Sequence, residues 1–176
     1  MTTIERIKTL IAAFSSPSID KRHESVKKVA TYGERAVAPL IEALEDATYP
    51  DLQWYIATAL ARIGKPAIVP LLAAMSQNSD PGFRKYAAAA LGEIGVPAVE
   101  PVIEAMAVDD RELRGFLSLA LCRIGKPAIE PLTRRLESSN DIIKTCAALT
   151  LWQMGEEGIG VMVKNTNQEE ISKKDM

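Results

Sequence analysis

The chain has 176 residues, of which 47% are hydrophobic, 25% are charged and 5% are aromatic, and its formal charge is −2. This balance gives no overall basic field, which argues against nucleic acid as a partner. Two cysteines are too few for a disulfide framework and indicate a reducing, cytoplasmic setting.

The first segment, "MTTIERIKTLIAAF", carries charges within its apolar run, so it is expected to be neither a signal peptide nor a membrane anchor. Its apolar residues recur at helical spacing. They predict an amphipathic helix near residues 3–14 with one apolar side, formed by Ile4, Ile7, Leu10, Ile11 and Phe14.

Further along the chain, a glycine follows an apolar helical pattern at intervals of 31, 31, 30 and 30 residues: Gly33, Gly64, Gly95, Gly125 and Gly155. A fixed period of this length is typical of a repeat array. Upstream of each glycine, the residues one, four and eight positions earlier define one face of a helix. The glycine is expected to end that helix in the left-handed conformation of a C-cap.

Downstream of each glycine, the prolines predict a second helix. A tight turn should contain Pro66, Pro97 and Pro127, and the helix should start at Pro39, Pro70, Pro101 and Pro131. These helices should bury positions such as Leu40, Ile41 and Leu44, or Leu71, Leu72 and Met75. Aspartates near the end of each following loop are expected to cap the next helix: Asp51, Asp80, Asp110 and Asp141.

Each period therefore predicts a helical hairpin, and stacked hairpins share a continuous core. We expect a single array over residues 1–164, with a capping helix in 1–17 and repeats in 18–48, 49–79, 80–109, 110–139 and 140–164. The polar tail, 165–176, is expected to be disordered.

Residues 84–106, "RKYAAAALGEIGVPAVEPVIEAM", resemble the HEAT-like repeat named after phycobilisome lyases, and the resemblance extends over about residues 18–163. The expected fold class is all-α, a right-handed α-solenoid (α-α superhelix) of about five HEAT-like hairpins. The resemblance implies that the helix before each glycine lines a concave surface. It also implies a range of roles: bilin lyase subunits, phycobilisome-degradation proteins and deoxyhypusine hydroxylase.

Aromatic side chains gather on two adjacent rows of the expected concave helices. Nine residues before the glycine stand Glu24, Tyr55, Tyr86, Phe116 and Cys146, and ten before it stand His23, Trp54, Lys85, Gly115 and Thr145. Exposed aromatics with mixed charges suit a protein or peptide partner. We therefore predict a partner-binding face comprising Trp54, Tyr55, Tyr86, Phe116, Lys85 and Glu24. The alternative is that Tyr55, Tyr86 and Phe116 pack against one another between repeats.

A third row, eleven residues before the glycine, contains Arg22, Gln53, Arg84, Arg114 and Lys144. We interpret Arg22, Arg84, Arg114 and Lys144 as a structural ladder that ties each helix to an aspartate or a carbonyl of the preceding loop. An anion-binding stripe is the alternative.

The sequence offers little for chemistry. In the hydroxylase resemblance, His-Glu pairs at this repeat position hold two irons, but His23-Glu24 is the only such pair here. Cys122 and Cys146 lie three or four repeats from His23, too far for a Cys-His dyad. Cys146 is either a reactive thiol or an inert small residue. We expect no catalytic residue, no metal site and no cofactor.

We therefore predict a non-catalytic adaptor that binds a protein or peptide on its concave aromatic face. The alternative is a phycobilin lyase-type or phycobilisome-associated subunit that handles a chromophore or its carrier protein. A third possibility is self-association through the C-terminal end, where the last repeat lacks both prolines and is a weak cap.

Overall fold

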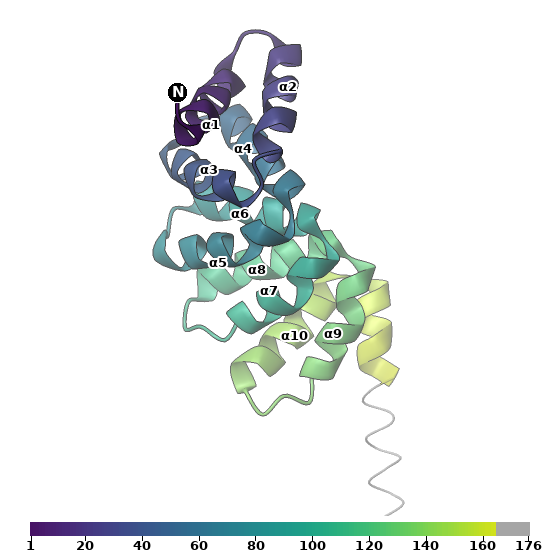
Figure 1. Ribbon diagram of the computed structural model, residues 1–176. Helices are drawn as coiled ribbons and strands as arrows, with labels where there is room; N and C mark the ends of the chain where they lie inside the picture. Colours follow the sequence, from purple (N-terminus) through teal and green to yellow (C-terminus); the bar gives the residue numbers. More distant parts are fainter. Residues whose placement is uncertain (165–176) are drawn as a thin grey trace, which may run out of the picture. The chain divides into compact units, whose positions relative to one another are not determined.

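The computed structural model describes residues 1–164, which are helical with no β-strand among them (Figure 1). The expectation of a disordered tail concerns residues outside this range. The helices form two compact units, Met1–Ala98 and Val99 onward.

The first unit contains six α-helices joined by short turns. They are α1 (Thr3–Ala12), α2 (Ile19–Ala30), α3 (Glu34–Asp46), α4 (Pro50–Ile63), α5 (Ile68–Gln77) and α6 (Pro81–Ile94), with 3₁₀ turns at Ala13–Ser15, Lys65–Ala67 and Val96–Ala98. One layer is formed by α2, α4 and α6, which pack side by side, and the other by α1, α3 and α5. Apolar side chains such as Ile7, Leu40, Ile56 and Leu91 are fully buried between the layers. This burial is the main stabilising contribution to the unit.

The second unit repeats the same arrangement. It contains α7 (Val99–Ala105), α8 (Arg111–Ile124), a 3₁₀ turn at Lys126–Ala128, α9 (Ile129–Arg135) and α10 (Asp141–Gln153), and a further helical stretch spans 156–164. Here α8 packs beside α10 and α7 beside α9, while α7 also packs on α8 and α9 on α10, across the loops that join consecutive hairpins. Leu117, Leu121, Leu132 and Leu151 are buried between these helices.

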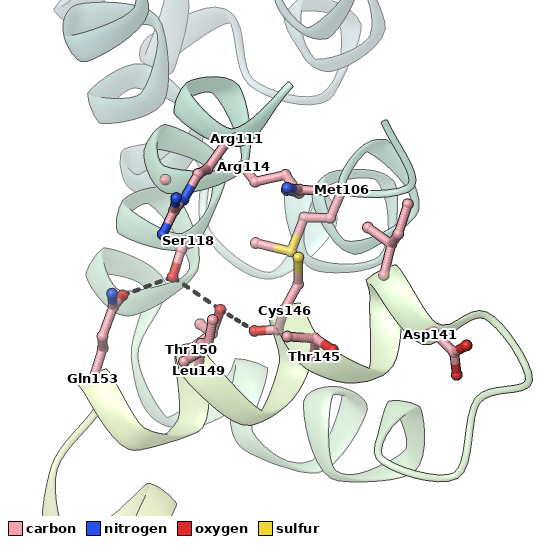
Figure 2. A pocket seen from close by; sticks show the side chains of 12 residues that line it. Met106, Arg111, Arg114, Ser118, Asp141, Thr145, Cys146, Leu149, Thr150 and Gln153 are labelled. Atoms are coloured by element: carbon pink, nitrogen blue, oxygen red, sulfur yellow. Dashed lines mark hydrogen bonds between the residues drawn. The ribbon is translucent and has the colours of Figure 1, made fainter. Parts of the chain in front are cut away.

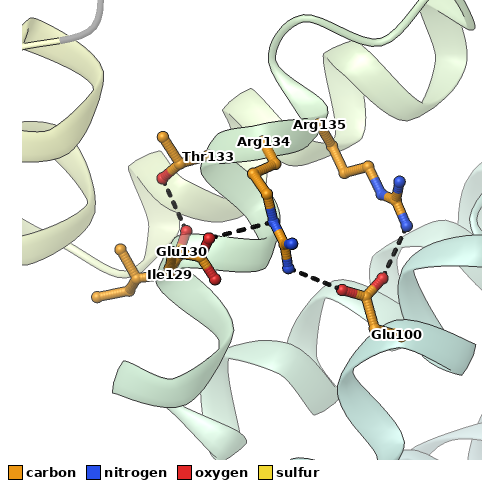
Figure 3. Close-up of polar contacts among 6 residues, drawn as sticks. All are labelled: Glu100, Ile129, Glu130, Thr133, Arg134 and Arg135. Carbon is orange, nitrogen blue, oxygen red and sulfur yellow. Dashed lines mark hydrogen bonds and ion pairs between the residues drawn. The ribbon is translucent and has the colours of Figure 1, made fainter.

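Ion pairs also join the α7–α9 layer at its surface (Figure 3). The Glu100 carboxylate accepts hydrogen bonds from Arg134 at 3.2 Å and from Arg135 at 2.7 Å. Arg134 also pairs with Glu130 one helical turn away, at 3.2 Å. Half-exposed ion pairs of this kind add little to stability individually.

The junction within each hairpin depends on the recurring glycine. All five have positive φ, from 55° at Gly33 to 80° at Gly95. The expected left-handed C-cap is only half right, because ψ at Gly64, Gly95 and Gly125 is −135°, −138° and −136°. This combination lies outside the left-handed helical region and close to one that is essentially restricted to glycine. The glycine carbonyl then accepts from the amide three residues later, as Ala67 N to Gly64 O at 2.9 Å.

The second helices start as expected in three hairpins and differ in the first. Pro70, Pro101 and Pro131 are each the third residue of α5, α7 and α9, within the first turn. Pro39 instead lies inside α3, which begins five residues earlier at Glu34. The first hairpin has Arg35 where the others have a turn proline, so the chain enters the α-helix directly after the glycine.

Two expectations need correction: the aspartate caps and the apolar side of α1. Asp80 and Asp110 are N-caps, but α2 is capped by Ser18 and α10 by Asn140, while Tyr49 precedes α4 without a side-chain cap. Asp51 and Asp141 lie instead in the first turn, where a negative charge is favourable. In α1, Ile7 and Ile11 are buried, but Ile4 is 47% exposed.

The structure thus confirms an all-α solenoid class built from repeated helical hairpins. Within residues 1–164, no single helix is long and apolar enough to cross a membrane. Only α4 and the segment Lys65–Gln77 taken together have the required length and composition, and the chain bends by 118° between them. The same residues contain no group of His, Cys, Asp or Glu arranged to hold a metal ion.

Candidate functional site

Trp54 and Tyr55 are adjacent in α4, but they have opposite environments. Trp54 is 49% exposed, whereas Tyr55 is only 7% exposed. The two rings meet edge to face, with centroids 4.9 Å apart and an interplanar angle of 81°. Successive residues on a helix point about 100° apart, so one side chain reaches solvent and the next reaches the interior. The expectation that Tyr55 lies on an exposed row is therefore wrong.

The Tyr55 ring is held by residues from the capping segment and from the repeat before it. Its centroid lies 6.4 Å from the ring centroid of Phe14 and 5.7 Å from that of His23. The central guanidinium carbon of Arg22 lies over the ring, 5.6 Å from its centroid. Aromatic and cation–π contacts of this kind favour a defined ring orientation. Tyr55 is thus a fixed base for the Trp54 ring. The alternative prediction, packing between repeats, describes Tyr55 well, although its partners are Phe14 and His23.

Around Trp54, the neighbouring helices of the same layer present polar side chains. His23 and Glu24 on α2 and Lys85 on α6 are exposed, while Tyr86 on α6 is half-buried. The Lys85 ammonium lies 5.6 Å from the centre of the Tyr86 ring. Lys28 pairs with Glu24 at 2.6 Å, and its hydrogen bond and charge lower the pKa of the Glu24 carboxyl. We call His23, Glu24, Trp54, Lys85 and Tyr86 the Trp54 surface.

Phe116 is the remaining aromatic of the predicted face. It lies on α8 in the second unit and is half-buried. Its partner-binding role, like that of the residues of the Trp54 surface, stays a prediction.

The arginine row makes one repeated contact. Arg22 donates to Ser16 O, Gln53 to Ala47 O at 2.9 Å, Arg84 to Asn78 O at 2.9 Å, and Arg114 to Val108 O at 3.1 Å. Each acceptor is the carbonyl six residues earlier, in the loop before the helix. Arg84, which is 2% exposed, also donates to Met75 O at 3.1 Å. These contacts reach loop carbonyls, one of the two acceptor types expected, and Lys144 makes no equivalent contact within residues 1–164.

The two thiols have environments that disfavour reactivity. Cys146 is buried and Cys122 is half-buried. Burial raises the pKa of both thiols; the charge of Arg114 opposes part of the rise at Cys146, and a hydrogen bond with Ser118 opposes part of it at Cys122. Because the thiolate is the nucleophile, both thiols are protonated and inert at neutral pH.

A cavity of about 510 Å³ lies between α8 and α10 in the second unit (Figure 2). Its α8 wall includes Arg111, Arg114 and Ser118, and its α10 wall includes Leu149 and Thr150. At its floor, Ser118 bonds Thr150 at 2.9 Å and Gln153 at 2.7 Å, and Thr150 donates to Cys146 O at 2.7 Å.

Sequence reasoning missed this cavity, although one signal was present. Gly115 breaks the row that contains His23, Trp54, Lys85 and Thr145 in the other repeats, and it lines the cavity. A missing side chain on an otherwise occupied row was the clue.

Part of this chain is similar to a known family of repeats. A family model described as HEAT repeats matches residues 37–115. The match does not distinguish the phycobilisome-lyase type of repeat. Comparison with curated proteins gave no match.

Several designed proteins are similar in structure. An engineered protein from a structural genomics consortium has 20% sequence identity and a TM-score of 0.38, with 95% of this chain and 87% of that chain covered. A designed armadillo repeat protein in complex with the peptide (KR)4 has 14% identity and a TM-score of 0.35, with 95% and 90% covered. Computationally designed armadillo repeat proteins for modular peptide recognition are represented at 15% identity and a TM-score of 0.32, with 82% and 80% covered.

Proposed function

We propose that this chain is a non-catalytic interaction scaffold that binds a protein or peptide through the Trp54 surface. The observation that carries the proposal is the half-exposed Trp54 indole, fixed edge to face on the buried Tyr55 ring. An exposed tryptophan whose orientation is fixed in advance loses little entropy on binding, and tryptophan is among the residues that dominate binding energy at interfaces. Repeat scaffolds of this class commonly supply binding surfaces and no chemistry of their own.

The charges around Trp54 have mixed sign, which supports a protein or peptide over nucleic acid. Glu24 and Lys85 are exposed on α2 and α6, the two helices that pack beside α4. A nucleic-acid groove would need a continuous basic stripe to neutralise phosphates. A polar rim around an aromatic centre is instead typical of protein interfaces.

The test uses peptides selected from a displayed library against the full chain. Their affinities are measured for the wild type, Trp54→Ala and Trp152→Ala by fluorescence anisotropy. Trp152 is 64% exposed on α10, so Trp152→Ala is a matched control for the loss of an exposed indole. We expect Trp54→Ala to weaken most selected peptides at least tenfold, or about 1.4 kcal/mol, and Trp152→Ala to leave them unchanged.

Equal binding by the wild type and Trp54→Ala would contradict the proposal for this surface. Circular dichroism checks that each variant keeps its helix content. Because Tyr55 supports the Trp54 ring, we also expect Tyr55→Leu to weaken binding of the same peptides, although the buried Tyr55 side chain would not contact them.

The phycobilin lyase-type role is the alternative that the sequence resemblance suggests. Burial of Tyr55 leaves Trp54 as the exposed ring of α4, which fits a side-chain contact better than an enclosing chromophore cavity. Adding a free bilin to the chain and recording visible absorbance separates the two roles. A spectral shift that Trp54→Ala abolishes would favour the chromophore role.

A further inference from the structure

The cavity between α8 and α10 has the size and the polarity pattern of a small-molecule site. Its volume of about 510 Å³ falls within the usual range for ligand cavities. It combines apolar side chains, including Met106 and Leu149, with a polar floor of the buried Ser118 and Thr150; Ser118 also hydrogen-bonds the exposed Gln153. Leu149 is exposed beside this opening rather than packed in the core.

Gly115 keeps the entrance open. It lies in the interior of α8, where glycine is less favourable than alanine. A Cβ atom at this position would meet no heavy atom within 4 Å, so close packing does not require glycine here. In the first unit, the same row position is occupied by the indole of Trp54. The glycine therefore leaves space that a side chain would otherwise fill.

Positive charge is concentrated on the α8 wall. Arg114 uses one guanidinium nitrogen for the Val108 carbonyl, while Arg111 is exposed and forms no hydrogen bond or ion pair with another residue in 1–164. Figure 2 shows both arginines on the same side of the cavity, with the carboxylate of Asp141 turned away from them. A guanidinium is well suited to pair with a carboxylate.

We propose that this cavity binds a small carboxylate with an apolar body, the carboxylate pairing with Arg111 and the apolar body entering beside Gly115 and Leu149. The polar floor offers further hydrogen-bonding groups to the ligand. This site lies in the second unit and does not rest on the proposed function of the Trp54 surface.

The test uses isothermal titration calorimetry on the full chain to compare the affinities of three probes that share a naphthalene ring and differ in charge. They are 2-naphthoate, the neutral 2-naphthalenemethanol and the cationic 2-naphthylmethylammonium. We expect 2-naphthoate to bind most tightly. Arg111→Gln should weaken 2-naphthoate about fivefold to tenfold and leave the alcohol unchanged, because only the anion pairs with the guanidinium.

Gly115→Phe tests the location, because a ring at this position would occupy the entrance; it should abolish binding of 2-naphthoate. Gly115→Ala adds one methyl group and should retain binding. Arg62→Gln, on α4 in the other unit, is the charge-matched control and should bind like the wild type.

The proposal is overturned if no probe binds, if the alcohol binds as tightly as 2-naphthoate, or if Arg62→Gln weakens binding as much as Arg111→Gln does. Retained binding by a folded Gly115→Phe variant would also overturn it. If Gly115→Phe fails to fold, the Arg111→Gln variant still tests the proposal, because Arg111 is exposed and its substitution should not affect folding. In that case, the amide shift of Gly115 on adding 2-naphthoate to the wild type locates the site, and an unmoved Gly115 resonance refutes it.

Discussion

At the scale of single residues, glycine has two distinct functions in this chain, and they predict opposite effects of one substitution. At Gly95, φ is +80° and ψ is −138°, and a Cβ would meet no atom within 4 Å. Gly95→Ala should therefore destabilise the fold by about 1–3 kcal/mol through backbone strain alone. Gly115→Ala, within α8, should stabilise it by about 0.5–1 kcal/mol. Urea unfolding curves measure the change in the free energy of unfolding for both variants. Changes of the same sign would contradict this assignment.

The thiols give a second prediction at this scale. Burial raises the pKa of Cys122 and Cys146, so the folded chain should react with iodoacetamide at neutral pH at least about tenfold more slowly than the urea-unfolded chain.

The same shifts set the pH dependence of stability. Because the folded pKa is raised, the contribution is fully present below the unfolded-state pKa and is lost as pH rises through the folded pKa. Cys122→Ala/Cys146→Ala should lose less stability between neutral and alkaline pH than the wild type. In the iodoacetamide experiment, rapid labelling of either thiol in the folded chain would contradict the assignment of both thiols as protonated and inert.

At the scale of helices and loops, the row of side chains that donate to carbonyls six residues earlier fixes where each helix follows its loop. Arg84 is the most buried member and donates to two carbonyls, Asn78 O and Met75 O. Arg84→Met keeps an apolar side chain but removes the donors, and should cost about 2–4 kcal/mol. Lys144→Met, at the equivalent exposed position, should change stability by less than about 0.5 kcal/mol. Chemical denaturation compares the two, and an equal loss would contradict the ladder.

Much of this element-level arrangement follows from sequence pattern. Helical spacing and the recurring glycine predict the hairpins, because both reflect local backbone preferences. The entry into α3 differs because Arg35 replaces a turn proline, a change whose effect depends on how the next turn packs. The carbonyl acceptors of the arginine row were foreseen only as a class, since loop backbone positions are set by tertiary packing.

The candidate sites were less predictable for a physical reason. Trp54 and Tyr55 are adjacent, so their side chains point about 100° apart, and the orientation of α4 about its own axis decides which of them is exposed. That orientation depends on the packing of Phe14 and His23, from the capping segment and the preceding repeat, against Tyr55. The cavity at Gly115 depends on two helices from different repeats, so pattern along one helix does not reveal it.

At the scale of the whole molecule, a repeat array is stabilised by packing within each hairpin and between neighbours along the chain. The described chain divides into two compact units, and each has its own buried apolar side chains. The chain supplies one tryptophan to each: Trp54 in α4 and Trp152 in α10. Each indole is thus a probe of its own unit.

This arrangement predicts that a local loss of stability is reported unequally by the two tryptophans. Trp152→Phe leaves Trp54 as the fluorescent probe, and Trp54→Phe leaves Trp152. Adding Arg84→Met to each background should lower the urea midpoint reported by Trp54 more than that reported by Trp152, because nearest-neighbour coupling limits how far the loss spreads. Circular dichroism on the same samples should then show a broadened helix transition. Equal shifts of both midpoints, with one sharp transition, would instead mean that residues 1–164 unfold as a single cooperative body.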